Sequence, residues 1–326
     1  MHFTKMHGLG NDYIYFDLLT YPITQNDAQW QTAAVLLSNR HTGIGGDGIV
    51  LIMPPTDEAC DFRMRIFNAD GSEAEMCGNA SRCIGKYVYE RGLTSKTIVA
   101  LETGAGVKKL HLQVNNGVVE TVCVEMGKAV VEQGARNQEQ RLDSSLDEGF
   151  SVDEGLRIKD KRLNSSDSES AAWRPHLHAT SETKVISPCS LFLPSSIVDM
   201  GNPHAVVLVD GEITDEMVWQ MGPHIEKDSR FPNGTNVEFV RVENRQELTM
   251  RVWERGSGET MACGTGACAA AVAAHAQGLT DNEVTVHLLG GDLHISIDKD
   301  WHVRMTGGAT IVFDGEVEVP LVADPR

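Results

Sequence analysis

Two stretches of this chain decide its fold: RIFNADGSEAEMCGNASRCIGKYVYERGLT at residues 65–94 and RVWERGSGETMACGTGACAAAVAAHAQGLT at residues 251–280. They are related by a shift of 186 residues, and the match extends without a gap from 65–104 to 251–290. Eight of those 40 aligned positions are identical, among them the Cys-Gly pairs at 77–78 and 263–264. An internal match of this kind predicts a duplicated structural unit.

Both copies carry the same order of local signals. An alternating, strand-like segment leads into a polar turn, the turn leads into Cys-Gly, and a helix-like segment follows. Fifteen residues after its cysteine each helix meets a glycine, Gly92 or Gly278, which can take the left-handed conformation that ends a helix. We therefore predict an α/β (α+β) protein of two pseudo-symmetric lobes, whose central helices start face to face across a cleft.

The chain has 326 residues and a formal net charge of −18, from 28 Lys and Arg against 46 Asp and Glu. This charge argues against binding to nucleic acid or to an anionic membrane surface, because both need clustered cations. An anionic substrate would have to be held by local dipoles and a few placed cations. Residues 131–186 are polar and poor in aliphatic side chains, so we predict a surface insertion there.

Seven cysteines, an odd number, occur without a Cys-x-x-Cys pair. At the start of the chain no apolar core follows a basic segment, and the longest apolar run, 267–274, is far shorter than the roughly 20 residues that span a bilayer. These features predict a cytoplasmic protein with reduced thiols. The cysteine spacings within the two copies, without a histidine pair at a ligand interval, predict no metal site.

Cys77 and Cys263 differ from the other five cysteines, which we interpret as packing residues, because each stands at the start of a predicted helix. The free N–H groups there stabilise a thiolate, which lowers the thiol pKa, and they can also bind a carboxylate. Gly78 and Gly264 let an anion approach the backbone. Two such sites facing each other would put one sulfur on each side of an α-carbon, as inversion by one base and one acid without a cofactor requires.

Polar residues in or beside glycine-rich turns complete the candidate site, although asparagine is common in turns for its backbone preferences alone. Arg255 could bind a carboxylate and Glu254 an ammonium group, as a zwitterionic substrate needs. The other candidates are Asn11, Asn68, Asn79, Asn202, His204 and Asn236.

Together these motifs closely resemble those of the diaminopimelate epimerase family. The matching stretches, spread over nearly the whole chain in the family's order, are MHGLGND at 6–12, FNADGSE at 67–73, MCGN at 76–79, MGNPH at 200–204, WERG at 253–256 and ACGTG at 262–266. The resemblance implies a cofactor-independent isomerase that interconverts LL- and meso-diaminopimelate in lysine and peptidoglycan precursor biosynthesis. It also implies a homodimer with two lobes in each chain, each lobe a strongly curved, mostly antiparallel sheet around its central helix.

The resemblance further implies roles for the matching residues. Cys77 and Cys263 would form the acid–base pair, while backbone N–H groups at 78–79 and 264–265 (Gly78, Asn79, Gly264 and Thr265) would bind the reacting carboxylate. Glu254, with His204 as an auxiliary, would contact the reacting amino group. The distal end of the substrate would be held by Asn11, Asn68, Asn202, Asn236 and Arg255.

The family's last strand returns to the first lobe, so the lobes are expected at 1–127 plus 307–326 and at 128–306, the second with the polar insertion at about 131–186. Two features depart from the family pattern. Many relatives have glutamine where this chain has Gly48, so one substrate hydrogen bond is expected to be missing or replaced. The polar stretch is also longer than is usual in the family.

Two alternatives remain open at this point. A proline or hydroxyproline racemase-like enzyme also uses two facing cysteines, but that class typically has histidine after its first Cys-Gly, where this chain has Asn79. Arg255 also favours a substrate with a distal carboxylate. The second alternative is a protein without catalytic activity, a thiol switch or a metal-binding protein.

Overall fold

Helices α2 (Gly78–Glu90) and α5 (Gly264–Ala276) organise the structure, a computed structural model that describes residues 1–133 and 196–318. Each helix begins directly after a cysteine, and the glycine that follows each C-terminus, Gly92 or Gly278, has φ +71°. Both bounds of α5 lie 186 residues after those of α2. The repeat and its left-handed glycines are therefore confirmed.

Three shorter helical segments complete the helices of the described residues. These are α1 (Asp27–Ser38), the π-helical turn η2 (Met217–Met221) and α4 (Gly222–Glu226). A capping box between Asn26 and Gln29 starts α1.

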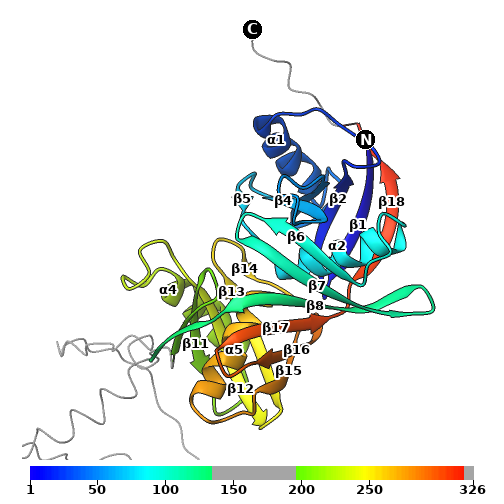
Figure 1. The fold of residues 1–326 in the computed structure, drawn as a ribbon. Coiled ribbons are helices and arrows are strands. Elements are labelled where there is room, and N and C mark those ends of the chain that lie inside the picture. Colours follow the sequence, from blue (N-terminus) through cyan, green and yellow to red (C-terminus); the bar gives the residue numbers. More distant parts are fainter. Residues whose placement is uncertain (134–195, 319–326) are drawn as a thin grey trace, which may run out of the picture. The chain divides into compact units, whose positions relative to one another are not determined.

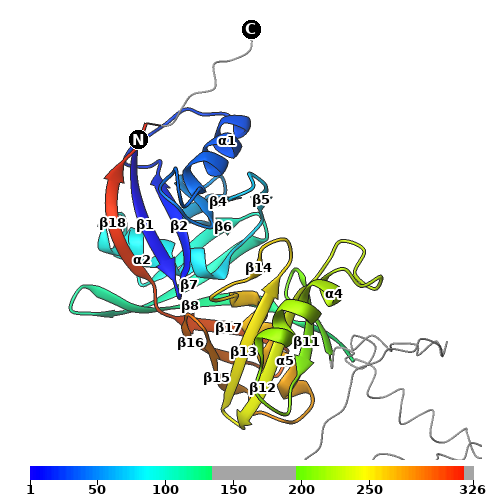
Figure 2. The ribbon, with the colours of Figure 1, turned by 180° about the vertical axis from the view of Figure 1, so that it is seen from behind.

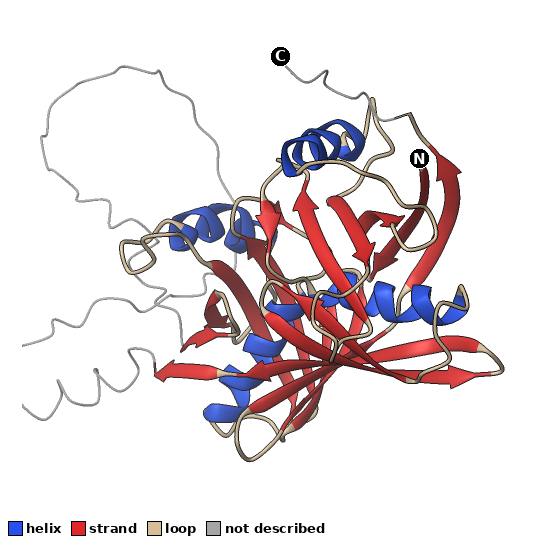
Figure 3. Cartoon of the chain, turned by 45° about the horizontal axis from the view of Figure 1, so that its top comes forward, coloured by secondary structure: helices blue, strands red, loops and turns tan. Residues whose placement is uncertain are grey.

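Strands make up most of the regular structure, as Figure 3 shows. In chain order they are β1 (His2–Gly8), β2 (Asn11–Asp17), β3 (Gly48–Met53), β4 (Phe62–Asn68), β5 (Glu73–Ala74), β6 (Ile98–Thr103), β7 (Gly106–Asn115), β8 (Val118–Lys128), β9 (Val130–Gln133), β10 (Ser196–Asp199), β11 (Pro203–Leu208), β12 (Asn236–Asn244), β13 (Glu247–Glu254), β14 (Gly258–Glu259), β15 (Glu283–Leu288), β16 (Gly291–Ile297), β17 (His302–Gly307) and β18 (Thr310–Glu316).

Neighbouring strands pair mostly antiparallel, and the two copies pair alike. The parallel pair β4–β6 brackets α2 in the chain, and the parallel pair β13–β15 brackets α5. Strand β8 pairs with β7 and also with β17, so it joins the strands of the two copies (Figures 1 and 2). Strand β18 pairs with β1. The fold is thus mixed α+β and dominated by sheet, while the division into two lobes stays a prediction.

The core explains why both helices hold their positions. In α2 the apolar side chains at helical spacing are buried, namely Ala80, Cys83, Ile84, Tyr87 and Val88. In α5 every residue from 267 to 274 is fully buried, as its alanine-rich sequence predicts. Both helices pack into one apolar cluster, and the small alanine side chains of α5 let strands approach that helix closely.

The predicted polar insertion needs one correction. Its first residues belong to β9, which pairs with β10, so a strand runs to Gln133. Strand β10 begins at Ser196. The remainder of the predicted insertion lies outside the described residues.

Candidate active site

The two cysteines that precede the helices cap them with extended backbone. Cys77 has φ −138° and Cys263 has φ −114°, and both thiols are free. The N–H of Gly266 donates to the Cys263 sulfur at 3.4 Å, and the Thr265 hydroxyl lies 3.5 Å from it. The Cys77 thiol, which is less buried, donates instead to Oδ1 of Asn11 at 3.5 Å. Both sulfurs therefore lie at a helix N-terminus, as predicted.

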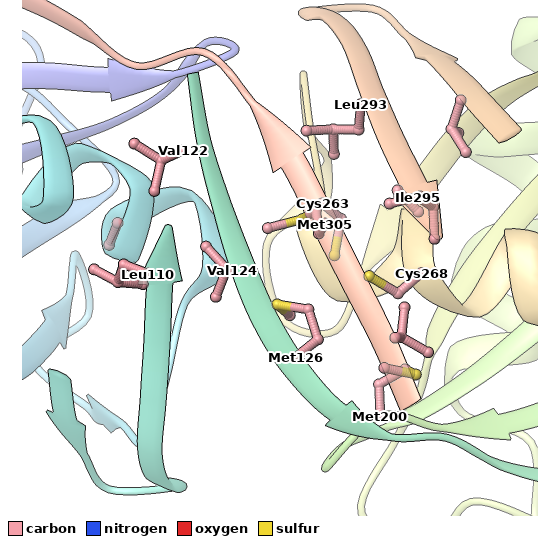
Figure 4. Packing of buried hydrophobic residues seen from close by; sticks show 14 of the residues in the cluster. Leu110, Val122, Val124, Met126, Met200, Cys263, Cys268, Leu293, Ile295 and Met305 are labelled. Carbon is pink, nitrogen blue, oxygen red and sulfur yellow. The ribbon is translucent and has the colours of Figure 1, made fainter. Parts of the chain in front are cut away.

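The two helix starts are brought together around Met305 of β17. A Cβ atom on Gly78 would lie 2.6 Å from Cε of Met305, and one on Gly264 would lie 2.9 Å from its Sδ. A side chain at either position would force this fully buried methionine to move. Figure 4 shows Met305 beside Cys263 and close to Met126 of β8. The Cys-Gly pairs of the two copies thus share one neighbour.

Asn79 bridges the two copies directly. Its Nδ2 donates to the carbonyl of Ala262 at 3.0 Å and to Oδ1 of Asn11 at 3.1 Å. Its own Oδ1 is buried without a hydrogen-bond partner and lies 3.4 Å from the place of a Cβ on Gly264. Asn11 is fixed in turn by Asp47, whose Oδ2 accepts from its Nδ2 at 2.7 Å. The predicted residues Asn11, Asn79 and Cys77 therefore form one connected group.

Glu254, at the end of β13, acts on both thiols. Its charge raises the pKa of Cys77 and that of Cys263. Burial raises the pKa of the Glu254 carboxyl, whereas hydrogen bonds from the hydroxyl of Thr260 and from the Cys263 thiol lower it. The prediction gave Glu254 to the substrate amino group, and here the carboxylate already contacts Cys263.

His204 belongs to a buried pair that the sequence did not reveal. Its Nδ1 lies 2.7 Å from Oε1 of Glu238, and its Nε2 lies 3.0 Å from Oδ1 of Asn202. Both His204 and Glu238 are completely buried. The same Glu238 oxygen would be 2.7 Å from a Cβ on Gly266, in the first turn of α5. This pair therefore lies beneath Cys263.

The residues predicted to hold a distal group are positioned less uniformly. Asn236 accepts the N–H of Arg255 at 2.9 Å, and the exposed Arg255 side chain donates to the carbonyl of Asn233 at 3.2 Å. Asn68 instead donates to the Ser72 hydroxyl of its own turn at 3.0 Å. Asn202, Asn236 and Arg255 thus lie around β11–β13, while Asn68 lies at the end of β4.

Gly48 has no space for a side chain. A Cβ there would lie 2.2 Å from the carbonyl oxygen of Phe67 and 3.0 Å from the Tyr13 ring. Glycine lets β3 pair closely with both β2 and β4 at this point. A glutamine therefore does not fit on this backbone.

The thiol pKa values run against the sequence prediction. Burial raises the pKa of Cys77 and the charge of Glu254 adds to this, while the N–H groups of residues 79 and 80 and the guanidinium of Arg82 lower it. Burial, and after it the carboxylates of Glu254 and Glu238, raises the pKa of Cys263 well above its usual range. The expected lowering was wrong for the protein without substrate: the helix N–H groups act in the predicted direction, but desolvation outweighs them.

Sequence reasoning missed Glu238, Asp47, Met305 and Arg82. A charge within the apolar strand sequence NVEFV was a signal for Glu238. Nothing in the sequence singled out Met305. Among the described residues there is no cluster of three or more histidine, cysteine or acidic side chains that could hold a metal ion.

No helix in the described ranges is long and apolar enough to cross a membrane.

The fold of this chain is also found in solved structures of an epimerase and an isomerase. The chain superposes on a hydroxyproline epimerase of Agrobacterium vitis with a TM-score of 0.61 and 15% identity, covering 97% of this chain and 91% of that one. A methylitaconate-Δ-isomerase gives a TM-score of 0.57 and 14% identity over 100% and 99% of the two chains. The likeness to these two proteins lies in the fold.

The chain belongs to the diaminopimelate epimerase family. Residues 3–132 and 196–312 match the family described as diaminopimelate epimerase, so the match leaves out 133–195. The diaminopimelate epimerase of Methanococcus maripaludis is 41% identical over 98% of this chain and its own full length. That of Phocaeicola vulgatus is 45% identical over 97% of this chain and 98% of its own. The family named from the sequence motifs is thus confirmed.

Proposed function

We propose that this protein is an epimerase that interconverts LL- and meso-diaminopimelate, with Cys77 and Cys263 as its acid–base pair. The observation that carries the proposal is the meeting of two Cys-Gly helix starts around Met305. Membership in a family of isomerases named for this reaction supports the substrate. The proline or hydroxyproline racemase alternative has support only from a likeness of fold.

In the reaction, one cysteine as thiolate removes the α-proton and becomes a thiol. The other cysteine, as thiol, gives its proton to the opposite face of the carbon and becomes a thiolate, so the net number of protons is unchanged. An α-proton beside a carboxylate is very weakly acidic, and each pKa unit of mismatch costs about 1.4 kcal/mol. The charge that develops must therefore be stabilised in a site shielded from water.

Backbone N–H groups at Gly78–Asn79 and Gly264–Thr265 are the donors we assign to the reacting carboxylate, because both helix N-termini carry unpaired N–H groups. Glu254 would contact the reacting ammonium group. Its carboxylate also accepts a hydrogen bond from the Cys263 thiol, so it would link the ammonium group to the acid–base pair. His204, fixed by Glu238, is the auxiliary residue.

The distal end of the substrate is assigned to Asn11, Asn68, Asn202, Asn236 and Arg255. Arg255 supports a distal carboxylate because its exposed guanidinium has no carboxylate partner among the described residues. Gly48 contributes no side chain, so the hydrogen bond of the relatives' glutamine is absent here.

The same proposal includes the properties that the family resemblance implies: no cofactor, a homodimer in the cytoplasm, and a role in lysine and peptidoglycan precursor biosynthesis. It also includes the two lobes at 1–127 plus 307–326 and 128–306. Sedimentation at micromolar concentration tests the dimer, and a sedimenting mass of one chain would refute it.

Deuterium exchange tests the function directly. LL-diaminopimelate incubated with the protein in deuterated water should gain one deuterium at an α-carbon as it becomes meso, and proline or trans-4-hydroxyproline should gain none. Deuterium in proline alone would favour the racemase alternative. Absence of deuterium from all three compounds would reject an amino-acid epimerase.

A further inference from the structure

Arg82 is a buried cation for which the proposed chemistry has not yet accounted. It lies in α2, five residues after Cys77, and its side chain is completely buried. Its Nε donates to the carbonyl of Gly308 at 3.2 Å, and its Nη1 lies 3.5 Å from Sδ of Met305. Its Nη2 is buried without a hydrogen-bond partner.

Within the described ranges, no carboxylate lies within ion-pair distance of Arg82. The groups whose charge would act on it most strongly are Cys83, Cys77, Tyr15 and Cys268, all of which are neutral until they lose a proton. Moving a charged group out of water without a counter-ion is strongly unfavourable. By contrast, Lys86 on the same helix is paired with Glu90 at 2.7 Å.

The position of the Arg82 guanidinium indicates which neighbouring group could carry its negative counter-charge. Helical side chains point back toward the N-terminus, and Arg82 accordingly touches Met305, the residue that packs on Gly78 and Gly264. Burial raises the pKa of Cys83 to about 11 and that of Cys268 to about 12. Of the four acids around Arg82, only Cys77 has a less buried side chain and a helix start to stabilise its anion.

We propose that Arg82 is a positioning residue, the fixed counter-charge that stabilises negative charge on the Cys77 sulfur at the start of α2. This proposal rests on the proposed function, since a thiolate at Cys77 is what the epimerisation needs. The second copy has no equivalent, because position 268, which corresponds to 82, is a cysteine. Cys263 faces the carboxylates of Glu254 and Glu238 instead.

The backbone N–H groups of residues 79 and 80 also favour the anionic form of Cys77, whereas the other ionisable side chains around it oppose that form or are neutral. Glu254 of β13 opposes thiolate formation. The phenols of Tyr13 and Tyr15 on β2 interact electrostatically with the same Cys77 sulfur. Cys83 of α2 is the remaining ionisable neighbour. Arg82 is therefore a buried cation whose charge favours the anionic form of Cys77.

A first measurement uses the unmodified protein. Iodoacetamide alkylation of Cys77 and Cys263 is followed separately by peptide mass spectrometry between pH 6 and 11, without substrate. We expect the alkylation rate of Cys77 to reach its midpoint at a lower pH than that of Cys263. A Cys263 midpoint equal to or below that of Cys77 would overturn the proposal, and this comparison needs no variant that folds.

A second measurement uses Arg82→Met, Arg82→Lys and the control Lys86→Met. Arg82→Met should raise the Cys77 midpoint by about one pH unit or more, the size of effect that a nearby opposite charge has on a pKa. It should also lower kcat about tenfold or more with little change in KM, because each pKa unit corresponds to a factor of ten. Arg82→Lys should restore most of the shift, and Lys86→Met should cause none because Glu90 already balances that charge.

Loss of activity in Arg82→Met with an unchanged Cys77 midpoint would show a merely structural role and overturn the proposal. An equal shift at both cysteines would overturn it as well. Alkylation is measured without substrate, so it separates this inference from the proposed function. If the unmodified protein moves no deuterium into diaminopimelate, the function fails, whatever the midpoints show.

Discussion

The start of α2 and the start of α5 are built from the same sequence pattern but differ in charge. In both, an arginine on the preceding strand pairs with a glutamate eight residues later, Arg65 with Glu73 and Arg251 with Glu259, each at 2.7 Å. Both then run through Cys-Gly into a helix of 13 residues. Duplication thus preserves the backbone that presents a sulfur.

The difference lies in what surrounds each sulfur. The guanidinium of Arg82 lowers the pKa of Cys77, while the carboxylates of Glu254 and Glu238 raise the pKa of Cys263. A two-base inversion needs one thiolate and one thiol at any moment. The repeated sequence therefore places the two sulfurs in the same way at their helices. The residues that differ between the two copies make the two thiols differ in acidity.

The largest expected effect comes from removing either sulfur. Cys77→Ala and Cys263→Ala should each reduce epimerisation by about 10³-fold or more, because each removes one of the two proton-transferring groups. Circular dichroism and thermal melting should show folded proteins. Activity close to that of the unmodified enzyme in either variant would contradict the claim that both cysteines are required.

Filling the space at a helix start should come next. Gly264→Ala puts a methyl group 2.9 Å from Met305 Sδ, so we expect a loss of about 1–3 kcal/mol in unfolding free energy and reduced activity. Gly211→Ala is the control, because nothing lies within 4 Å of its Cβ position. Urea unfolding measures both. Equal stability of the two variants would contradict the close packing around Met305.

The charge difference can be sharpened at Glu238. Glu238→Gln removes a carboxylate that raises the pKa of Cys263, so the midpoint of Cys263 alkylation should move to lower pH. The midpoint of Cys77 should stay in place. A larger shift at Cys77 than at Cys263 would contradict the placement of this carboxylate beneath α5.

A related pH effect on stability follows from the raised pKa values of both thiols. A folded-state pKa above the unfolded value means that the folded protein favours the neutral thiol, so this contribution to stability is present below the unfolded pKa of roughly 8.5 and is lost as the pH rises above it. The unfolding free energy, measured with urea, should fall as the pH rises from 8 to 10. This fall should be smaller in Cys263→Ala than in the unmodified protein. A pH dependence unchanged by that variant would contradict the direction given for Cys263.

The smallest effect concerns the two repeated ion pairs. Arg65→Gln and Arg251→Gln should each lower the unfolding free energy by no more than about 1 kcal/mol, since both pairs are partly open to solvent. Arg251→Gln should cost more, because side-chain exposure is 15% for Glu259 and 42% for Glu73. Urea unfolding at low and high salt measures the loss for each variant. A larger loss in Arg65→Gln than in Arg251→Gln would show that burial does not decide how much each ion pair contributes.

Sequence alone predicted the repeat, the start of both helices and the family, because these depend on local signals. Cys-Gly after a polar turn and glycine fifteen residues later fix α2 and α5 without knowledge of tertiary contacts. The direction of the shift in the thiol pKa values was predicted wrongly. It depends on how deeply each thiol is buried, and the sequence does not specify the burial of a single residue.

The partners of the site could not be predicted for the same reason. Glu238 meets His204 only because β11 and β12 pair in parallel with His204 opposite Asn236, a register that no local pattern reveals. Arg82 has the sequence position of an ordinary helical arginine, and its burial comes from β17 and the turn after it. The strand at 130–133 likewise depends on its partner β10.

A crystal structure with α-methyl-diaminopimelate, whose reacting carbon has no proton to lose, tests the central claim most directly. We expect the sulfurs of Cys77 and Cys263 on opposite sides of that carbon, each within about 3.5 Å of it or of its methyl group. Both sulfurs on one side, or one of them out of reach of the ligand, would contradict inversion between two thiols.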